Sequence, residues 1–357
     1  MKIIHTSDIH IDSPLTARLP RDKIKERRTE LIGNLRRLTE QAKRQGVTAI
    51  IVAGDMFDAE RVTRRALTAL VDAVEGARDI EFFVLPGNHD RGVFDSEEFK
   101  NLRNLHVFTY GKTETFDCEG GVTVTGISPC RAGMFDGLEL DADKKNIVVV
   151  HGELRDKSDE ASESIGLGEA AGKAIDYIAL GHYHSYSVHR IDERGVAVYS
   201  GTPEGRGFDE AGECGYVLID TEGKLTHSFV PFARRKIRII PLDLTGISRT
   251  PEIKDRAEVA LSAVPSSDLV RLELCGRFIP GLWKDTTALT EAFRDRFYHF
   301  EVKDRSAISV NPEDYKNDKT LKGEFIRTVY ADESLSEAEK AKIVECGLSA
   351  LLGDSYH

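Results

Sequence analysis

The apolar positions in the first half of the chain follow two alternating patterns. Five short apolar runs, rich in β-branched residues, occupy positions 2–4, 49–52, 82–85, 147–150 and 177–180. Runs of this length and composition predict buried strands. Between them, apolar residues recur at helical spacing over 24–42, a stretch closed by Gly46, and again over 62–77. These stretches predict helices that cross over a sheet and cover one of its faces.

After residue 184 the pattern becomes that of short strands separated by glycine-containing turns. The predicted strands lie at 188–191, 197–199, 216–219 and 225–229. A mixed first part followed by an antiparallel second part predicts two sheets packed face to face with helices outside. The fold class is therefore α/β, and the expected architecture is a four-layer αββα sandwich.

The pattern changes again beyond residue 232. A strand at 237–244, a helix at 251–263, a strand at 269–274, a helix at 287–297 and a strand at 298–302 are expected. This βαβαβ stretch predicts a small α+β domain. We therefore expect three parts, at residues 1–232, 233–310 and 311–357.

The C-terminal part is polar from Asn311 to Phe325 and then ends in a helix. Ser336 and Glu339 form the capping box of that helix, and Gly353 is its stop signal. Its apolar face is made by Ile343, Val344, Leu348, Leu351 and Leu352. Two uses of this face stay open, namely packing on its own domain or docking a partner.

Composition narrows the class of protein. With 40% hydrophobic and 31% charged residues among 357, the chain is an ordinary globular one. Its net charge of −11 argues against coating nucleic acid by bulk electrostatics, although bound cations could supply local positive charge. Basic clusters at 21–28, 61–65 and 234–238 are interpreted as solvated helix faces or strand ends.

The expected compartment is the cytoplasm, with no membrane association. No apolar stretch approaches the roughly 20 residues of a membrane span, and no signal peptide precedes the first strand. Five widely separated cysteines make a disulfide framework or a thiolate zinc site improbable.

Each of the five apolar runs is followed by Asp, Asn or His side chains. The blocks are Asp8-Ile9-His10, Gly54-Asp55-Met56-Phe57-Asp58, Gly87-Asn88-His89-Asp90, His151-Gly152 and Gly181-His182-Tyr183-His184. Strand ends are where an α/β sheet usually keeps its active site. Imidazole and carboxylate without thiolate suit a pair of divalent ions such as Mn²⁺, Fe²⁺ or Zn²⁺.

Seven side chains can ligate the two ions. They are Asp8, His10, Asp55, Asn88, His151, His182 and His184. Four protein ligands for each ion require eight bonds, so one ligand must bridge, and a carboxylate such as Asp55 does this best. The first ion is expected to take Asp8, His10, Asp55 and His184. The second is expected to take Asp55, Asn88, His151 and His182.

Two such ions would clamp a phosphoryl group for in-line attack by an acidified bridging water. His89 follows a ligand without being needed as one, so we expect it to be the general acid. Asp58 and Asp90 could orient the histidines. The backbone can approach the ions closely at glycines 54, 87, 152 and 181. His5 is expected to be a core residue of its strand.

These blocks resemble the calcineurin-like metallophosphoesterase superfamily over residues 1 to about 230. The opening His5-Thr6-Ser7-Asp8-Ile9-His10 is similar to SbcD-type DNA-repair nucleases. Residues 11–14, 322–327 and 347–353 look like the YhaO-type branch of that family. In two positions the chain departs from the better-known SbcD proteins: Ile9 replaces an aromatic residue, and Tyr183 replaces an aliphatic one.

The resemblance implies a metallophosphoesterase sandwich with an α+β capping domain. It implies a DNA exonuclease or endonuclease of double-strand-break repair that uses Mn²⁺, with Fe²⁺, Zn²⁺ or Mg²⁺ as alternatives. Family members commonly dimerise and pair with an SMC-like coiled-coil ATPase, of the SbcC or YhaN type. Two other functions stay open: a phosphomonoesterase or cyclic-nucleotide phosphodiesterase, and a non-catalytic protein that binds DNA ends.

Overall fold

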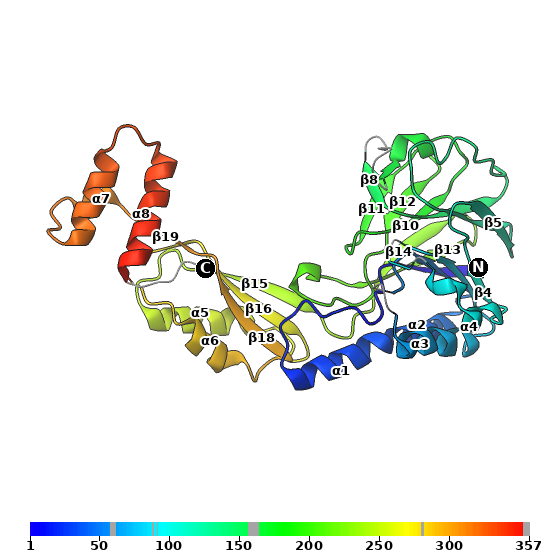
Figure 1. The fold of residues 1–357 in the computed structure, drawn as a ribbon, viewed down its shortest axis with the longest axis horizontal. Helices are drawn as coiled ribbons and strands as arrows, with labels where there is room; N and C mark the ends of the chain where they lie inside the picture. The colour runs from blue at the N-terminus through cyan, green and yellow to red at the C-terminus, as the bar shows by residue number, and fades with distance from the viewer. Residues whose placement is uncertain (58–61, 88, 91, 156–163, 280–281, 353–357) are drawn as a thin grey trace. The chain divides into compact units, whose positions relative to one another are not determined.

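The computed structural model describes residues 1–357 except 58–61, 88, 91, 156–163, 280–281 and 353–357. The chain forms two compact units, Met1–Ile237 and Arg238–His357, whose elements are labelled in Figure 1. The predicted α/β class is confirmed, because the first unit contains two mixed sheets and flanking helices.

The first sheet has the strand order β14-β13-β1-β2-β3-β4. Its strands are β1 Lys2–Thr6, β2 Ala49–Ala53, β3 Glu81–Leu85, β4 Leu105–Val107, β13 Gly215–Asp220 and β14 Thr226–Pro231. The first four run parallel, and β13 pairs antiparallel with β1. The sheet therefore takes strands from both ends of the first unit.

The second sheet has the order β11-β12-β10-β7-β6-β5. Its strands are β5 Thr113–Cys118, β6 Val122–Ile127, β7 Lys145–His151, β10 Tyr177–Gly181, β11 Ser187–Arg190 and β12 Val196–Tyr199. The four central strands are parallel, and the two edge strands are antiparallel to their neighbours. The stretches before and after residue 184 thus each contribute strands to both sheets, instead of forming one sheet each.

Alternation along the buried strands separates two cores. Ile3 and Ile51 belong to a cluster that also contains Val149 of the second sheet, so these side chains fill the space between the sheets. Ile4 and Ile50, one position along, pack with α2 and α3 on the other face. Both faces of the central strands are covered, which explains why the runs are continuously apolar.

The helices of the first unit are α1 Arg21–Ile32, α2 Asn34–Gln45, α3 Arg64–Glu75 and α4 Glu97–Lys100. The single helix expected over 24–42 is therefore two helices, separated at Gly33. Gly46 closes α2 in the left-handed conformation, as its position predicted. The outer face of the second sheet packs against Phe135, Ile165 and Ala170. Shorter elements are β8 Glu153–Arg155, β9 Ser164–Gly166, and 3₁₀ turns η1 Val93–Asp95, η2 Leu167–Ala170 and η3 Phe208–Glu210.

The second unit contains a three-stranded sheet of order β15-β16-β18. Its elements are β15 Ile237–Asp243, α5 Thr250–Leu261, β16 Leu269–Cys275, β17 Arg277–Phe278, α6 Thr286–Phe293, β18 His299–Asp304, β19 Ala307–Ile308, η4 Pro312–Tyr315, α7 Leu321–Ala331 and α8 Glu337–Leu352. The five elements expected between residues 237 and 302 all form. The domain limits of 232 and 310 stay a prediction.

The C-terminal helix α8 begins with the predicted capping box. The Ser336 N–H donates to Glu339 Oε2 at 2.8 Å, and the Glu339 N–H donates to Ser336 Oγ at 3.3 Å. Val344 and Leu348 are buried in the same core as Leu272 of β16. Ile343 and Leu351 are exposed. The preceding helix α7 was not predicted, and Gly353 and the Leu352 side chain lie outside the described residues.

No helix in the described part of the chain combines the length and apolarity needed to cross a membrane. All five cysteines are free, in agreement with the expectation that they form no disulfide framework. His5 is fully buried in β1, as expected of a core residue, and its Nδ1 lies 2.9 Å from the Tyr177 hydroxyl.

Candidate metal centre

The backbone is strained where the strands β1, β2 and β10 end. Asp8, His10, Asp55 and His182 have φ angles of 51°, 47°, 50° and 107°, a region that non-glycine residues seldom adopt. Backbone hydrogen bonds join the segment after β1 to the segment after β2. The Asp8 N–H donates to Gly54 O at 3.1 Å, and the His10 N–H donates to Asp55 O at 3.0 Å. Strain of this kind clusters at functional sites.

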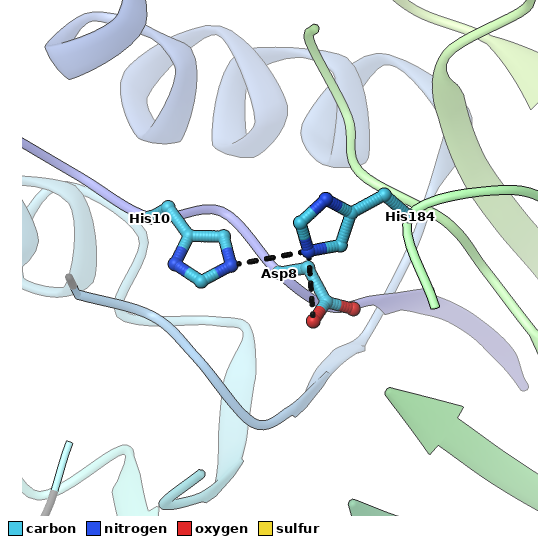
Figure 2. Close-up of side chains that lie close together, drawn as sticks. All are labelled: Asp8, His10 and His184. Carbon is cyan, nitrogen blue, oxygen red and sulfur yellow. Dashed lines mark hydrogen bonds and ion pairs between the residues drawn. The ribbon is translucent and has the colours of Figure 1, made fainter. Parts of the chain in front are cut away.

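Asp8, His10 and His184 form the first group of potential ligands, with ligand atoms within 4.8 Å of one another. Figure 2 shows the two imidazole rings turned toward each other above the carboxylate. The Nε2 atoms of His10 and His184 are 3.3 Å apart, and His184 Nε2 is 3.8 Å from Asp8 Oδ1. Two ring nitrogens and a carboxylate oxygen thus converge as donors to one cation would.

Asp55 lies between histidines of two groups. Its Oδ2 is 3.9 Å from His10 Nε2 and 3.3 Å from His151 Nε2. The second group, made by Asp8, Asp55 and His151, is as compact as the first. A carboxylate in this position has the placement that a bridging ligand needs.

The orientation of His151 is set by the backbone of β2. His151 Nδ1 lies 2.9 Å from the Ala53 carbonyl oxygen. Because a carbonyl only accepts hydrogen bonds, Nδ1 must carry a proton, and Nε2 faces Asp55. Nε2 is buried and lies 3.3 Å from Asp55 Oδ2. A buried nitrogen of this kind, aimed at a carboxylate, fits a metal ligand.

The charges of the acids and histidines in the site compensate one another. Burial opposes ionisation, but the hydrogen bond and charge between His151 and Asp55 raise the pKa of His151 to about 9 and lower that of Asp55 to about 2. Burial, with the nearby Arg206 charge, lowers the pKa of His10 to about 4. At neutral pH His151 is therefore protonated and His10 is neutral.

Glycine is required at the strand ends because neighbouring groups occupy the space of a side chain. A Cβ atom on Gly87 would lie 2.1 Å from Asp55 Oδ1, and one on Gly54 would lie 2.0 Å from His151 Nδ1. A Cβ on Gly181 would lie 1.8 Å from Ala53 O. Gly54 and Gly87 therefore make room for ligand side chains, and Gly181 makes room for the backbone of β2.

The structure places His182 and His89 at the rim of the site. His182 is exposed, its ring centroid is 5.5 Å from that of His151, and its N–H donates to both Asp8 carboxylate oxygens at 3.1 Å. His89 is exposed, and its ring centroid is 5.7 Å from that of His10. Asn88 and Asp58 were also expected here, but they lie outside the described residues.

Asp90 acts on backbone groups. Its buried carboxylate accepts hydrogen bonds from the N–H groups of Met56 at 2.9 Å, Phe57 at 2.8 Å and Gly87 at 3.1 Å. These bonds tie the segment after β2 to the one after β3, so Asp90 orders the backbone that carries Asp55. Burial raises the pKa of Asp90 to about 6.

Glu210 and Arg206 are two site residues that the sequence did not reveal. The side chain of Glu210 is only 2% exposed, and its Oε1 lies 2.7 Å from His184 Nδ1. Arg206 donates through Nε to the same oxygen at 3.0 Å, and through Nη1 to Ser13 Oγ at 2.8 Å. No spacing signal connects Glu210 to His184, because the two meet only through the fold.

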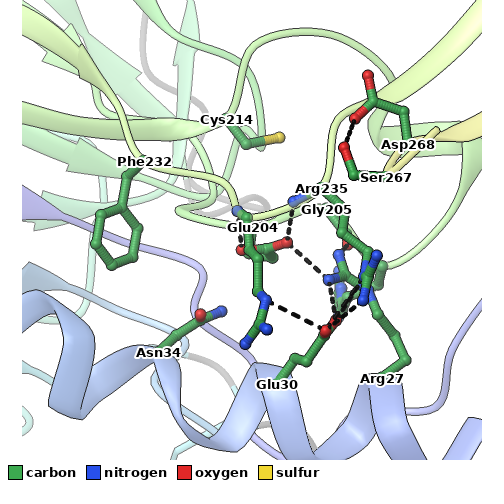
Figure 3. Close-up of polar contacts among 12 residues, drawn as sticks. Arg27, Glu30, Asn34, Glu204, Gly205, Cys214, Phe232, Arg235, Ser267 and Asp268 are labelled. Carbon is green, nitrogen blue, oxygen red and sulfur yellow. Dashed lines mark hydrogen bonds and ion pairs between the residues drawn. The ribbon is translucent and has the colours of Figure 1, made fainter. Parts of the chain in front are cut away.

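A buried ionic network fixes the chain just before Arg206 (Figure 3). Arg27 of α1 is fully buried and donates to Glu204 Oε1 at 2.7 Å and to Gly205 O at 2.7 Å. Glu30 accepts from both Arg27 and Arg235. The basic clusters at 21–28 and 234–238 were interpreted as solvated surfaces. This is wrong for Arg27 and Arg235, because both form ion pairs with buried glutamates.

A family model for the calcineurin-like phosphoesterases matches residues 1–217. The chain therefore belongs to the calcineurin-like phosphoesterase family, whose fold uses a dimetal centre. The described donor set, Asp8, His10, Asp55, His151 and His184, fits such a centre, because it offers carboxylate and imidazole ligands in two overlapping groups.

Particular relatives are distant. Uncharacterized metallophosphoesterase YhaO of Bacillus subtilis is 25% identical over 244 residues, 64% of this chain and 60% of YhaO, so the chain spans less than two thirds of that relative. DNA double-strand break repair protein Mre11 of Sulfurisphaera tokodaii is 25% identical over 376 aligned positions, 96% of this chain and 92% of the relative. The SbcD component of nuclease SbcCD of Staphylococcus epidermidis is 23% identical over 287 aligned positions, 69% of this chain and 74% of the relative.

Proposed function

We propose that this protein is a metal-dependent DNA nuclease that hydrolyses phosphodiester bonds during double-strand-break repair. The observation that carries the proposal is the position of Asp55 Oδ2 between His10 and His151. That position suits a carboxylate shared by two ions about 3.5–4 Å apart, as in two-metal phosphodiester hydrolysis. The names of the relatives Mre11 and nuclease SbcCD support DNA as the substrate.

The proposed ligands are the two sets expected from the sequence. Asp8, His10, Asp55 and His184 would hold one ion, and Asp55, Asn88, His151 and His182 the other. The preferred ion is Mn²⁺, with Fe²⁺, Zn²⁺ or Mg²⁺ as alternatives, because the described ligands are imidazoles and carboxylates. When bound, the ions would acidify the attacking water and neutralise charge on the phosphoryl oxygens.

The chain's own groups would position the reaction and move the proton. His89 lies exposed at the rim, beside His10, where it could protonate the leaving oxygen. Its own backbone N–H donates to Asp55 Oδ1 at 3.3 Å, which fixes the main chain of His89 to a ligand. The Ala53 carbonyl fixes the tautomer of His151, and Glu210 orients His184.

Further assignments are part of the same proposal. The α+β part at 233–310 would cap the nuclease site, and the partners would be DNA, a second copy of the chain and an SMC-like ATPase of the SbcC or YhaN type. A phosphomonoesterase or cyclic-nucleotide phosphodiesterase is the second candidate. The net charge of −11 favours it, because a small ester presents fewer phosphates to an acidic protein.

The test compares substrates on one preparation. Wild type and His89→Ala are incubated with Mn²⁺ and end-labelled single- and double-stranded DNA, then with bis-p-nitrophenyl phosphate, p-nitrophenyl phosphate and a cyclic nucleotide. Cleavage of DNA and of the diester, reduced by roughly 10²–10⁴-fold in His89→Ala, is expected. Turnover of the monoester or cyclic nucleotide without DNA cleavage would refute the nuclease proposal. DNA-end binding without any turnover would instead indicate a non-catalytic protein.

A further inference from the structure

An aromatic ring stands beside the metal centre. Tyr183 lies between His182 and His184 in the chain, and 42% of it is exposed. Its ring centroid is 5.5 Å from that of His182, whose ring is in turn 5.5 Å from that of His151. Tyr183 therefore belongs to the rim of the site, although it is not one of the potential ligands.

Several contacts hold this exposed ring in place. The Tyr183 hydroxyl donates to Glu153 Oε1 at 2.9 Å. The ring meets that of Tyr199 at a centroid distance of 4.9 Å and an angle of 74°. Tyr199 is buried, and its hydroxyl donates to Gly152 O and accepts from the Leu154 N–H, each at 2.8 Å. The ring is thus positioned before any ligand arrives, which reduces the entropy that binding would cost.

The ring of Tyr183 is partly open to solvent and has no parallel-stacked partner among these neighbours. The planes of Tyr199 and His182 meet that of Tyr183 at 74° and 59°, so neither ring stacks parallel to it. Exposed tyrosines commonly serve as flat surfaces for nucleobases, because every base has a π face.

The carboxylate that anchors Tyr183 is paired with an arginine. Glu153 would repel a nucleic acid strand if it were unpaired, but Arg155 donates to Glu153 Oε2 through Nε at 3.0 Å and through Nη2 at 2.7 Å. The tyrosine is therefore anchored by a carboxylate whose charge is matched.

We propose that Tyr183 is a stacking platform for a nucleobase next to the bond that is cleaved, and that it makes the site selective for nucleotide esters. This inference rests on the proposed nuclease function and names how that site recognises its substrate. A phosphate on the metal centre carries its neighbouring base past the rim, where the ring of Tyr183 lies. Losing one base–aromatic contact of this kind reduces affinity about tenfold.

The test separates stacking from structural support. Wild type, Tyr183→Leu and Tyr183→Phe are assayed with Mn²⁺ on single-stranded oligonucleotides that carry one abasic residue, scanned through every position. Tyr183→Leu should raise KM about tenfold on the intact strand, with a smaller effect on kcat. With the abasic residue beside the cleaved bond, wild type and Tyr183→Leu should have the same KM. Tyr183→Phe should fall between them, because it keeps the ring and loses the anchor to Glu153.

Tyr186→Leu is the matched control. Tyr186 is 37% exposed in the same segment, but its ring packs against Phe229 of β14. The KM of Tyr186→Leu should equal that of wild type on every oligonucleotide. Thermal unfolding of each variant shows whether it is folded.

A binding measurement completes the test without turnover. In the His89→Ala background, an oligonucleotide containing 2-aminopurine should lose fluorescence on binding, and adding Tyr183→Leu should abolish that quenching. An equal KM penalty on intact and abasic strands would overturn the platform, and so would unchanged quenching. If wild type neither binds nor cleaves any oligonucleotide, the nuclease proposal itself fails, and the platform fails with it.

Discussion

Glu210 Oε1 lies 2.7 Å from Nδ1 of His184, on the ring edge opposite the nitrogen that faces His10. A carboxylate behind a histidine fixes its tautomer and makes the other nitrogen a better ligand. The position of Glu210 depends on Arg206, which in turn contacts Ser13 after β1. Three segments distant in sequence are thereby joined behind one proposed ligand.

Substitution of Glu210 should therefore weaken metal binding. Glu210→Gln is expected to reduce Mn²⁺ affinity by roughly 10- to 100-fold, measured by calorimetry or by electron paramagnetic resonance of free Mn²⁺. Glu213→Gln is the matched control, because Glu213 is half exposed and pairs with Lys236. Equal Mn²⁺ affinity in wild type and Glu210→Gln would show that Glu210 does not support His184.

Metal uptake should release a proton. Because the pKa of His151 is raised to about 9 beside Asp55, this ring is protonated at pH 7.5 in the metal-free protein. A ligating histidine must be neutral, so metal affinity should increase with pH up to about 9. Calorimetry at pH 7.5 in buffers of different ionisation enthalpy should detect about one proton released. A binding enthalpy that is the same in all buffers would contradict this.

The same pair should affect the stability of the metal-free protein. A raised histidine pKa adds stability below about pH 6.5 that disappears as the pH rises through about 9, and the lowered pKa of Asp55 adds stability above about pH 4 that disappears toward pH 2. In chelator, the free energy of unfolding of wild type should exceed that of Asp55→Asn most between pH 4 and 6.5. If the difference in unfolding free energy between wild type and Asp55→Asn grew from pH 6.5 to 9, the prediction would be contradicted.

Replacing Gly181 should disturb the fold and the site together. The Cβ of Gly181→Ala would lie 1.8 Å from Ala53 O and 2.8 Å from His151 Nδ1. Overpacking of this kind costs about 1–3 kcal/mol, which denaturant unfolding can measure. Gly168→Ala is the control, since its Cβ would meet no atom within 4 Å. If Gly181→Ala were as stable as wild type, the end of β10 would be able to move away from Ala53 of β2 without cost.

Arg27 should contribute strongly to the folding stability of the first unit. It is fully buried between Glu30 and Glu204, so Arg27→Met leaves two buried carboxylates without their shared cation. Removing one partner of a buried pair costs about 3–5 kcal/mol. Arg36→Met should change stability by less than about 1 kcal/mol, because the Arg36–Glu40 pair is exposed. If both variants unfold at the same denaturant concentration, the network is not stabilising.

The amino-acid sequence by itself determined the five strands that lead into the site, the residues at their ends and the α/β class, but not strands such as β5 and β6. Buried parallel strands must be apolar on both faces, so runs such as that of β2 are recognisable without a fold. Because such strands end at one edge, residues after different strands, such as Asp8 and Asp55, could be expected to meet. Local rules also predicted the caps at Gly46 and Ser336.

Only the tertiary structure decided which side chains support that edge. The contact of Glu210 with His184, the burial of Arg27 and the anchoring of Tyr183 on Glu153 leave no periodic or local trace in the sequence. The entry of β13 into the first sheet likewise depends on pairing with the distant β1. Periodicity reports which positions are buried, whereas these contacts depend on which buried or exposed surfaces the folded chain brings together.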